Sequence, residues 1–427
     1  ENPYAIKNIA DFVKFLRTEQ NNLTNKENHY RIDNDINFNE LNFKYDVNVG
    51  IETKTELNNA YFGFNYETIH VDGNPFKGSI NGLGHGILNL YSEYDDRTHF
   101  GFIGVIDTNG VVERIVLENP KFISHKKKDT LKVYIGGIAG MNHGTIRQCG
   151  VTYGFDTNND VSDCLFSALP TTSNMSDKMG NIIGGIAAFT EGSNAKIINS
   201  FFDGTLEGDY VVGGITGILS NCASISGCYS HGQATGNIVA GIAGQIEENE
   251  RINISEPTQK LCKIEYCYSY MGLTGLGNNP VRSGIAKVNY ISVNNENKSV
   301  VVTFSYFITD YDITNPPSIN SITSDDGTIK TLPETNSIDK LRSYNQVKNT
   351  DGGYVNTTYV ARMVDSQASE YWFDSDLYGD WDIDGTADIS LLKQHNYGTP
   401  YITSIGNSVF YTISAWTNGT QLVYDEE

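Results

Sequence analysis

Gly136-Gly-Ile-Ala-Gly140 is the first of five copies of one short motif, and this repeat decides the fold. The other copies are Gly184-Gly-Ile-Ala-Ala188, Gly213-Gly-Ile-Thr-Gly217, Ala240-Gly-Ile-Ala-Gly244 and Ser283-Gly-Ile-Ala-Lys287. Their starts are 48, 29, 27 and 43 residues apart. Two steps nearly agree, and the other two exceed them by roughly 15 to 20 residues. We therefore expect one structural unit to recur, with insertions in some of its connections.

A second short β-like run beginning with Ile follows four of these motifs. The runs are Ile146-Arg-Gln-Cys149, Ile198-Asn-Ser-Phe201, Ile225-Ser-Gly-Cys228 and Ile264-Glu-Tyr-Cys267. Short β-branched runs within a unit of 27 to 29 residues are typical of one coil of a parallel β-helix, in which equivalent strands pair about 4.8 Å apart. A propeller blade needs about 40 to 45 residues, so the shortest steps disfavour that alternative. The sequence predicts an all-β solenoid with an interior ladder of Ile.

Upstream segments resemble the entry coils of the GLUG-motif β-helices of bacterial surface proteins. The segments that carry this resemblance are Phe76-Lys-Gly-Ser-Ile-Asn-Gly-Leu-Gly-His-Gly-Ile-Leu-Asn-Leu90, Phe100-Gly-Phe-Ile-Gly104 and Val111-Val-Glu-Arg-Ile-Val-Leu-Glu-Asn119. It covers roughly residues 30 to 290, with a weaker echo at Trp381-Asp-Ile-Asp-Gly385. The resemblance implies a right-handed parallel β-helix and export to the cell surface or beyond. It implies little about activity, because the motif occurs both in adhesins and as a spacer in secreted proteases.

The remaining segments complete one continuous domain. Ile9, Phe12, Val13 and Leu16 share one helical face, so residues 1–30 are predicted to form a helical cap. The β-helix is expected over residues 31–309, with insertions near 152–182 and 247–261. Residues 310–370 are expected to form a long loop or small subdomain, and residues 371–427 a closing coil and C-terminal β cap.

Composition excludes several classes of function. The 427 residues include 30 Lys and Arg against 51 Asp and Glu, which gives a formal charge of -21. Such a field repels phosphate backbones, so nucleic-acid binding is not expected. No apolar run of about 20 residues occurs, so membrane insertion is not expected. Six Cys without a CxxC pair predict buried free thiols, although Cys228 with Cys267, or Cys222 with Cys262, could oxidise.

Aromatic residues recur one position after the predicted Cys ladder. If Cys points inward, alternation points the following rings outward, where they would form a platform on which sugar rings can stack. If the parity is reversed, these rings are core. The candidate ligand-binding residues are Phe202, Tyr229, Tyr268 and Tyr270, extended by Tyr153, Phe155, Tyr306 and Tyr311.

One acidic cluster has the spacing of a calcium loop. Asp380, Asp382 and Asp384 occupy positions 1, 3 and 5, and Gly385 occupies position 6. Leu391 stands at position 12, where a bidentate acid is expected. The cluster is therefore either a calcium site or an Asp-rich turn, and no other cofactor is expected.

These features favour a non-catalytic extracellular adhesin that binds an insoluble, neutral plant polysaccharide, with cellulose favoured. In overall plan the chain is similar to the tāpirins, which are secreted cellulose-attachment proteins. The runner-up is a β-helix polysaccharide lyase or glycoside hydrolase, whose first carboxylate candidates are Asp310, Asp312, Asp325 and Asp326. A passive surface stalk is the third hypothesis. No His-Glu-x-x-His motif of a zinc protease is present.

Overall fold

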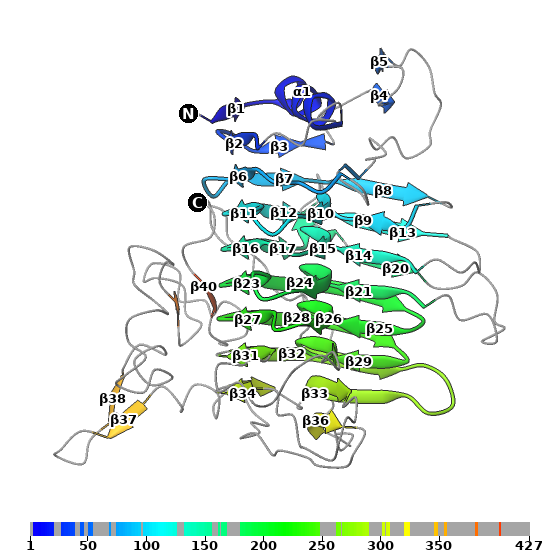
Figure 1. The fold of residues 1–427 in the computed structure, drawn as a ribbon, viewed down its shortest axis with the longest axis vertical. Helices are drawn as coiled ribbons and strands as arrows, with labels where there is room; N and C mark the ends of the chain where they lie inside the picture. Colours follow the sequence, from blue (N-terminus) through cyan, green and yellow to red (C-terminus); the bar gives the residue numbers. More distant parts are fainter. Residues whose placement is uncertain are drawn as a thin grey trace.

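The chain folds mainly into parallel β-sheets stacked in successive coils (Figure 1). The computed structural model describes residues 3–20, 27–38, 43–46, 50–53, 68–69, 74–94, 97–125, 132–155, 161–162, 164–168, 180–247, 262–265, 267–289, 301–303, 305–307, 320–324, 346–348, 354–356, 381–382 and 401–402. The strands of successive coils form three sheets, called sheets I, II and III below. The predicted solenoid of parallel strands is therefore present.

Sheet I contains one short strand from each coil. Its strands are β1 (Tyr4–Ile6), β2 (His29–Ile32), β6 (Ser79–Asn81), β11 (Val111–Glu113), β16 (Thr145–Arg147), β23 (Lys196–Ile198), β27 (Ser224–Ser226), β31 (Lys263–Glu265) and β34 (Val301–Thr303). Neighbouring strands in this order pair in parallel.

Sheet II begins as two shorter ladders that merge where the strands lengthen to eight residues. Its strands are β3 (Ile36–Asn37), β7 (Gly86–Leu88), β8 (Tyr91–Tyr94), β12 (Val116–Glu118), β13 (Lys121–Ser124), β17 (Gly150–Thr152), β20 (Leu165–Ala168), β24 (Phe201–Gly208), β28 (Tyr229–Gly236), β32 (Tyr268–Gly275) and β35 (Tyr306–Phe307).

Sheet III is also built from two ladders, and the Gly-Gly motif lies between them. The first ladder contains β9 (His99–Phe100), β14 (Tyr134–Gly136), β21 (Ile182–Gly184), β25 (Val211–Gly213) and β29 (Ile238–Ala240). The second contains β10 (Ile103–Ile106), β15 (Ala139–Asn142), β22 (Ala187–Glu191), β26 (Thr216–Ser220), β30 (Ala243–Glu247) and β36 (Asn320–Ser324). The long strand β33 (Val281–Asn289) joins the two ladders.

Coil-to-coil register confirms the interior ladder of Ile and corrects one of its members. In sheet I, Ile146 pairs with Ile197, which pairs with Ile225 and then Ile264. The predicted repeat placed Ile198 in this row, one residue too late. Adjacent Ile197 and Ile198 are indistinguishable in a pattern, and only Ile197 lies in the core.

The cysteines fill the interior, as expected for small apolar side chains. Cys149, Cys228 and Cys267 are fully buried in the core. Burial raises the pKa of the Cys149 thiol to about 12, so this group stays a thiol at neutral pH. Five of the six cysteines are buried. The prediction of buried free thiols is confirmed for Cys149, Cys228 and Cys267.

The second glycine of the repeated motif is required by the close approach of neighbouring coils. A Cβ at Gly214 would lie 2.0 Å from the carbonyl oxygen of Gly241, and one at Gly185 would lie 2.2 Å from the carbonyl oxygen of Gly214. Because these obstacles are backbone atoms, no side-chain movement can relieve the contact. The motif therefore sets the tight bend of each coil in sheet III.

The N-terminal segment covers the first coil with the predicted helix. Helix α1 (Ile9–Gln20) buries Phe12, Val13 and Leu16, and Asn8 caps its start by accepting a hydrogen bond from the Asp11 N–H at 3.0 Å. Strand β1, which precedes the helix, pairs with β2, so the segment is part of the sheet as well as a cap.

Four antiparallel strand pairs complete the described structure. They are β4 (Phe43–Asp46) with β5 (Gly50–Thr53), β18 (Gly154–Phe155) with β19 (Val161–Ser162), β37 (Gln346–Lys348) with β38 (Tyr354–Asn356), and β39 (Trp381–Asp382) with β40 (Tyr401–Ile402). Most of 310–370 and 371–427 lies outside the described residues, so the boundaries predicted there stay predictions. Among the described helices, none has the length and apolarity needed to cross a bilayer.

Candidate functional site

The predicted ring ladder exists, but its first member is Phe201 rather than Phe202. Phe201 pairs with Tyr229, and Tyr229 pairs with Tyr268. These rings alternate along the strands with core side chains such as Cys228, so they lie on the face of sheet II that points away from the core. Phe202 has the opposite parity and is itself a core residue.

The ring stack of Phe201, Tyr229 and Tyr268 is not the exposed platform that the sequence predicted. Its centroids lie 5.1 and 5.2 Å apart, with interplanar angles of 6° and 5°. Tyr229 and Tyr268 have no exposed surface, and Phe201 is 2% exposed. Because each ring stacks on the ring of the next coil, the faces that a sugar would need are occupied within the stack. The prediction for Tyr229 and Tyr268 as an exposed platform is therefore wrong.

The other predicted ring positions do not form a surface with them. Tyr153 is 6% exposed and belongs to the core, which corrects its assignment. Tyr270 is half-buried, and its ring centroid lies 5.9 Å from that of His231. For Phe155 and Tyr306 only the backbone is described, and Tyr311 lies outside the described residues.

A buried acid and imidazole lie beside the ring stack, in the next row of sheet II. Asp203 Oδ2 is 4.0 Å from His231 Nδ1, and His231 Nε2 is 3.2 Å from the Tyr268 hydroxyl. Both Asp203 carboxyl oxygens are buried without a hydrogen-bond partner. Desolvation therefore raises the pKa of Asp203 well above its usual value and lowers the pKa of His231 to about 3. Burial thus favours the uncharged form of each group, and neither is exposed.

Two further carboxyl groups, Asp35 and Glu118, lie near each other in the first coils. Asp35 accepts hydrogen bonds from the Gly86 N–H at 2.8 Å and approaches His85 Nδ1 at 3.1 Å. Burial and the nearby Asp35 charge raise the pKa of Glu118 to about 7. Within the described ranges, no group of three or more His, Cys, Asp or Glu side chains is placed to hold a metal ion.

The predicted calcium loop is not tested. Asp380 and Asp384 lie outside the described residues, and only the backbone of Asp382 is described, in β39. The carboxylates proposed for a lyase or hydrolase, Asp310, Asp312, Asp325 and Asp326, also lie outside them.

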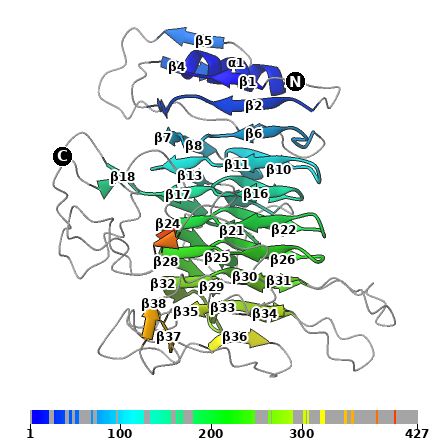
Figure 2. The same ribbon diagram turned by 90° about the vertical axis from the view of Figure 1, so that its left-hand side faces the viewer.

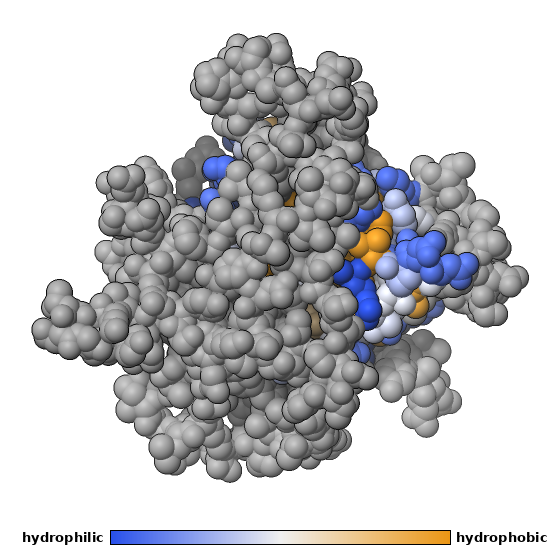
Figure 3. Space-filling model, turned by 90° about the horizontal axis from the view of Figure 1, so that it is seen from below, coloured by the Kyte–Doolittle hydropathy of each residue, from blue (hydrophilic) through white to orange (hydrophobic). Residues whose placement is uncertain are grey.

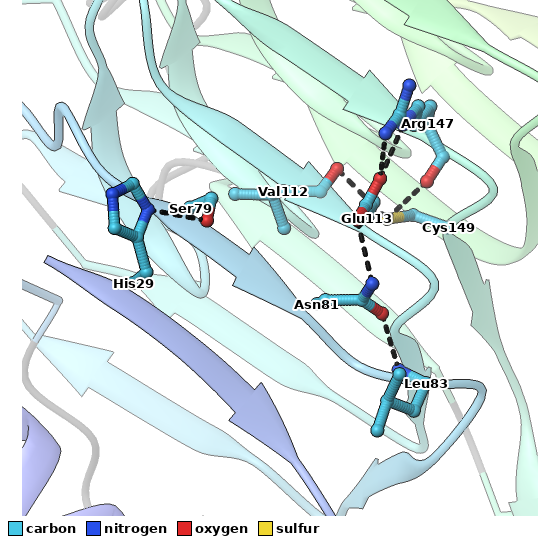
Figure 4. Close-up of polar contacts among 8 residues, drawn as sticks. All are labelled: His29, Ser79, Asn81, Leu83, Val112, Glu113, Arg147 and Cys149. Atoms are coloured by element: carbon cyan, nitrogen blue, oxygen red, sulfur yellow. Dashed lines mark hydrogen bonds and ion pairs between the residues drawn. The ribbon is translucent and has the colours of Figure 1, made fainter. Parts of the chain in front are cut away.

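The outward face of sheet I is a row of polar side chains that bond to one another (Figure 4). Asn81 donates to Glu113 at 2.8 Å, and Arg147 of the next coil forms an ion pair with the same carboxylate. In the adjacent row, His29 Nδ1 lies 2.9 Å from Ser79 Oγ. These contacts run from coil to coil over the first four coils of this face.

Sheet III carries a second apolar cluster that is separate from the core. We call it the sheet III strip, and it consists of Tyr134, Ile182, Ala188, Phe189, Tyr210, Val211, Ile218, Ile238 and Val281. Its aliphatic members, such as Ile182 and Val211, are buried, whereas Tyr134, Phe189 and Tyr210 are half-buried. The strip therefore presents aromatic side chains to solvent above an aliphatic base.

Register places the strip on the bend of sheet III. Tyr134, Ile182, Val211, Ile238 and Val281 pair in one row of the first ladder. Phe189 pairs with Ile218 in the second ladder. In the second ladder, a Cβ at Gly217 would lie 2.6 Å from Ile182 Cγ2, and one at Gly244 would lie 2.7 Å from Val211 Cγ1. The glycines thus allow the aliphatic side chains to lie flat across the bend.

The aromatic side chains of the strip are not stacked on one another as those of sheet II are. Tyr134 and Phe189 meet edge to face, with centroids 6.2 Å apart and planes at 75°. The buried His99 stacks on Tyr134 at 5.2 Å. In a view along the solenoid axis from the last coils, apolar side chains reach the surface on the side where Figure 1 places β25 and β29 (Figure 3).

Sequence reasoning missed this strip, although a signal was present. The residue two positions before each Gly-Gly-like pair is apolar in every copy, as in Tyr134-Ile-Gly136 and Ile182-Ile-Gly184. In four of the five copies the next residue is apolar too, and two adjacent apolar residues in a strand require both faces of the sheet to be apolar.

Comparison with known proteins gives limited matches. No protein-family model matches the sequence. Over 161 residues the chain is 29% identical to halomucin of Haloquadratum walsbyi; the match covers 38% of this chain and 2% of halomucin. The chain thus spans a small fraction of that relative's length. A crystal structure of a candidate immunoglobulin A1 protease from Bacteroides ovatus is similar with a TM-score of 0.46 and 18% identity, over 83% of this chain and 92% of the other.

Proposed function

We propose that this chain is an extracellular, right-handed parallel β-helix that binds an insoluble neutral polysaccharide, such as cellulose, without cleaving it. The proposed contact surface is the sheet III strip, in place of the ring stack on sheet II. The observation that carries the proposal is the presence of three half-buried aromatic side chains, Tyr134, Phe189 and Tyr210, over a separate apolar base. Aromatic faces of this kind stack on the apolar faces of sugar rings.

Charge supports a neutral ligand over an acidic one. The chain has a formal charge of -21, so a polyanion such as pectin would be repelled. In the row Met141, Phe189, Ile218, Gln245 and Lys287, the only charged side chain is that of Lys287. The strip itself contains no ionisable group other than the Tyr hydroxyls.

Similarity to part of halomucin supports an extracellular or cell-surface location, which we include in the proposal. The resemblances to GLUG-motif and tāpirin proteins point the same way. For the runner-up, a polysaccharide lyase or glycoside hydrolase, the described residues offer Asp203 and His231 as acid and base candidates. Their complete burial favours binding over catalysis.

The test is retention of the purified chain on microcrystalline cellulose, xylan, chitin and pectin, with released reducing ends and unsaturated products measured in the same tubes. We expect retention on cellulose, weaker retention on pectin, and no product. Retention should fall at least tenfold in Phe189→Ala. Tyr91→Ala serves as the matched control, because Tyr91 is a half-buried aromatic residue of sheet II. Product release without lasting retention would make this chain an enzyme and overturn the proposal.

A further inference from the structure

The three aromatic side chains of the sheet III strip come from three successive coils. Tyr134 lies in β14, Phe189 in β22 of the next coil, and Tyr210 directly before β25 of the coil after that. Strands β14, β21 and β25 are consecutive neighbours in the first ladder, as are β15, β22 and β26 in the second. Each of these coils therefore contributes one half-buried aromatic side chain.

No single coil offers two such side chains to one ligand. In the coil of Phe189, the equivalent of Tyr134 is Ile182, which is fully buried. In the coil of Tyr134, the equivalent of Phe189 is Met141. A chain lying along one strand would meet a single aromatic residue, whereas a chain lying across the strands meets all three.

Among the described residues, the aromatic series of the strip ends at Tyr134 on one side and at Tyr210 on the other. Before Tyr134 the row continues with His99, which is 3% exposed beneath the Tyr134 ring. In the coil after Tyr210, Ile238 stands in the row of Tyr134 and Gln245 in the row of Phe189, and Gln245 donates to Glu247 at 2.6 Å. Three coils span two steps of about 4.8 Å, or about 10 Å, which is longer than one hexopyranose ring.

We infer that the strip binds an internal stretch of an extended neutral glycan that runs parallel to the solenoid axis, with successive sugars on Tyr134, Phe189 and Tyr210. This inference rests on the proposed function and adds the direction and minimum length of its ligand. The buried Ile182 and Val211 keep the base flat between the aromatic positions. Each of the three successive coils thus supplies one aromatic subsite.

The test is competition by soluble glucose, cellobiose, cellotriose, cellotetraose and cellohexaose for the chain bound to microcrystalline cellulose. Glucose should not compete. The half-inhibitory concentration should fall at least tenfold from cellobiose to cellotetraose and change little for longer oligosaccharides. Equal competition by glucose and cellotetraose, with cellulose retention intact, would overturn the axial arrangement while leaving the proposed function standing. No retention on cellulose at all would instead contradict the proposed function.

Two variants test the direction in which the glycan runs. Tyr210→Ala removes one end of the aromatic series, so cellotriose should no longer compete better than cellobiose. Phe189→Ala removes the middle of the series and should weaken competition by every oligosaccharide longer than glucose. Tyr91→Ala on sheet II should leave the whole length series unchanged. If Tyr210→Ala left the length series unchanged in a chain with the wild-type circular dichroism spectrum, the third subsite would not exist and the inference would fail.

Discussion

Sheets II and III each carry aromatic side chains on the face away from the core, and the two sets are arranged in opposite ways. In sheet II, Phe201, Tyr229 and Tyr268 occupy one register position, their rings stack within 6° of parallel, and they have little or no exposed surface. In sheet III, Tyr134 and Phe189 come from different ladders and meet at 75°. The stacked rings of sheet II are buried, whereas Tyr134 and Phe189 keep exposed ring surface.

The strands that carry the ring stack, β24, β28 and β32, lie one above another in successive coils (Figure 2). A ring in the stack is held by the coil before and the coil after it. A ring in the strip rests on aliphatic side chains of its own sheet. The first arrangement makes the ring part of the solenoid, and the second makes it part of a surface.

The largest expected effect is on the stack. Tyr229→Ala removes a fully buried ring from between two stacked neighbours and leaves a cavity, so it should lower the free energy of unfolding by about 3 to 5 kcal/mol. Tyr229→Phe keeps the stack and should cost far less. Chemical denaturation followed by circular dichroism measures both. A cost below about 1 kcal/mol for Tyr229→Ala would mean that the stack does not support the coils.

The acid beside the stack gives a pH-dependent effect. The pKa of Asp203 is raised in the folded chain, so its contribution to stability is fully present below about pH 4 and is lost as pH rises toward the folded pKa. Asp203→Asn should therefore raise the melting temperature at pH 7 and have little effect near pH 4. A variant that gained stability only at low pH would contradict the buried, neutral carboxyl.

For His231, burial destabilises the folded chain at low pH instead of at high pH. Its folded pKa of about 3 lies below the usual value of 6.5, so its burial costs nothing above about pH 7 and costs progressively more as pH falls. His231→Gln should flatten the acid side of the stability profile between about pH 6 and pH 3. Melting temperatures across that range measure it, and an unchanged acid slope would show that His231 is not buried as a neutral imidazole.

A smaller stability effect is expected in the strip. Phe189 is half-buried, so Phe189→Ala should cost about 1 to 2 kcal/mol of unfolding free energy, well below the cost of Tyr229→Ala. Parallel denaturation curves compare the two variants directly. Equal costs would place Phe189 in a structural role like that of the stack and would remove the distinction between the two sheets.

The smallest effect is expected on sheet I. Arg147→Ala breaks a partly exposed ion pair with Glu113, which should change the free energy of unfolding by less than about 1 kcal/mol and leave cellulose retention unchanged. Reduced retention in this variant would move the ligand from sheet III to the polar face shown in Figure 4.

The coil architecture could be predicted because glycine and isoleucine each have one strict requirement. Gly214 has no space for a Cβ, and Ile225 and Ile264 must repeat at one interior position, so both leave a periodic trace in the sequence. The parity of the rings stayed open in the sequence, and neighbouring Phe201 and Phe202 fit the pattern equally well. Exposure could not be predicted either, since alternation assigns the face on which a ring lies and not what packs against that ring.

The measurement that tests the account most directly is the cellulose binding isotherm of Tyr134→Ala combined with Phe189→Ala, beside Tyr91→Ala and Tyr229→Phe, all at a temperature where circular dichroism shows each chain folded. We predict that the double variant loses at least a hundredfold in affinity while both controls bind as the wild-type chain does. Wild-type affinity in the double variant, or loss of binding in Tyr229→Phe, would contradict the assignment of ligand binding to sheet III.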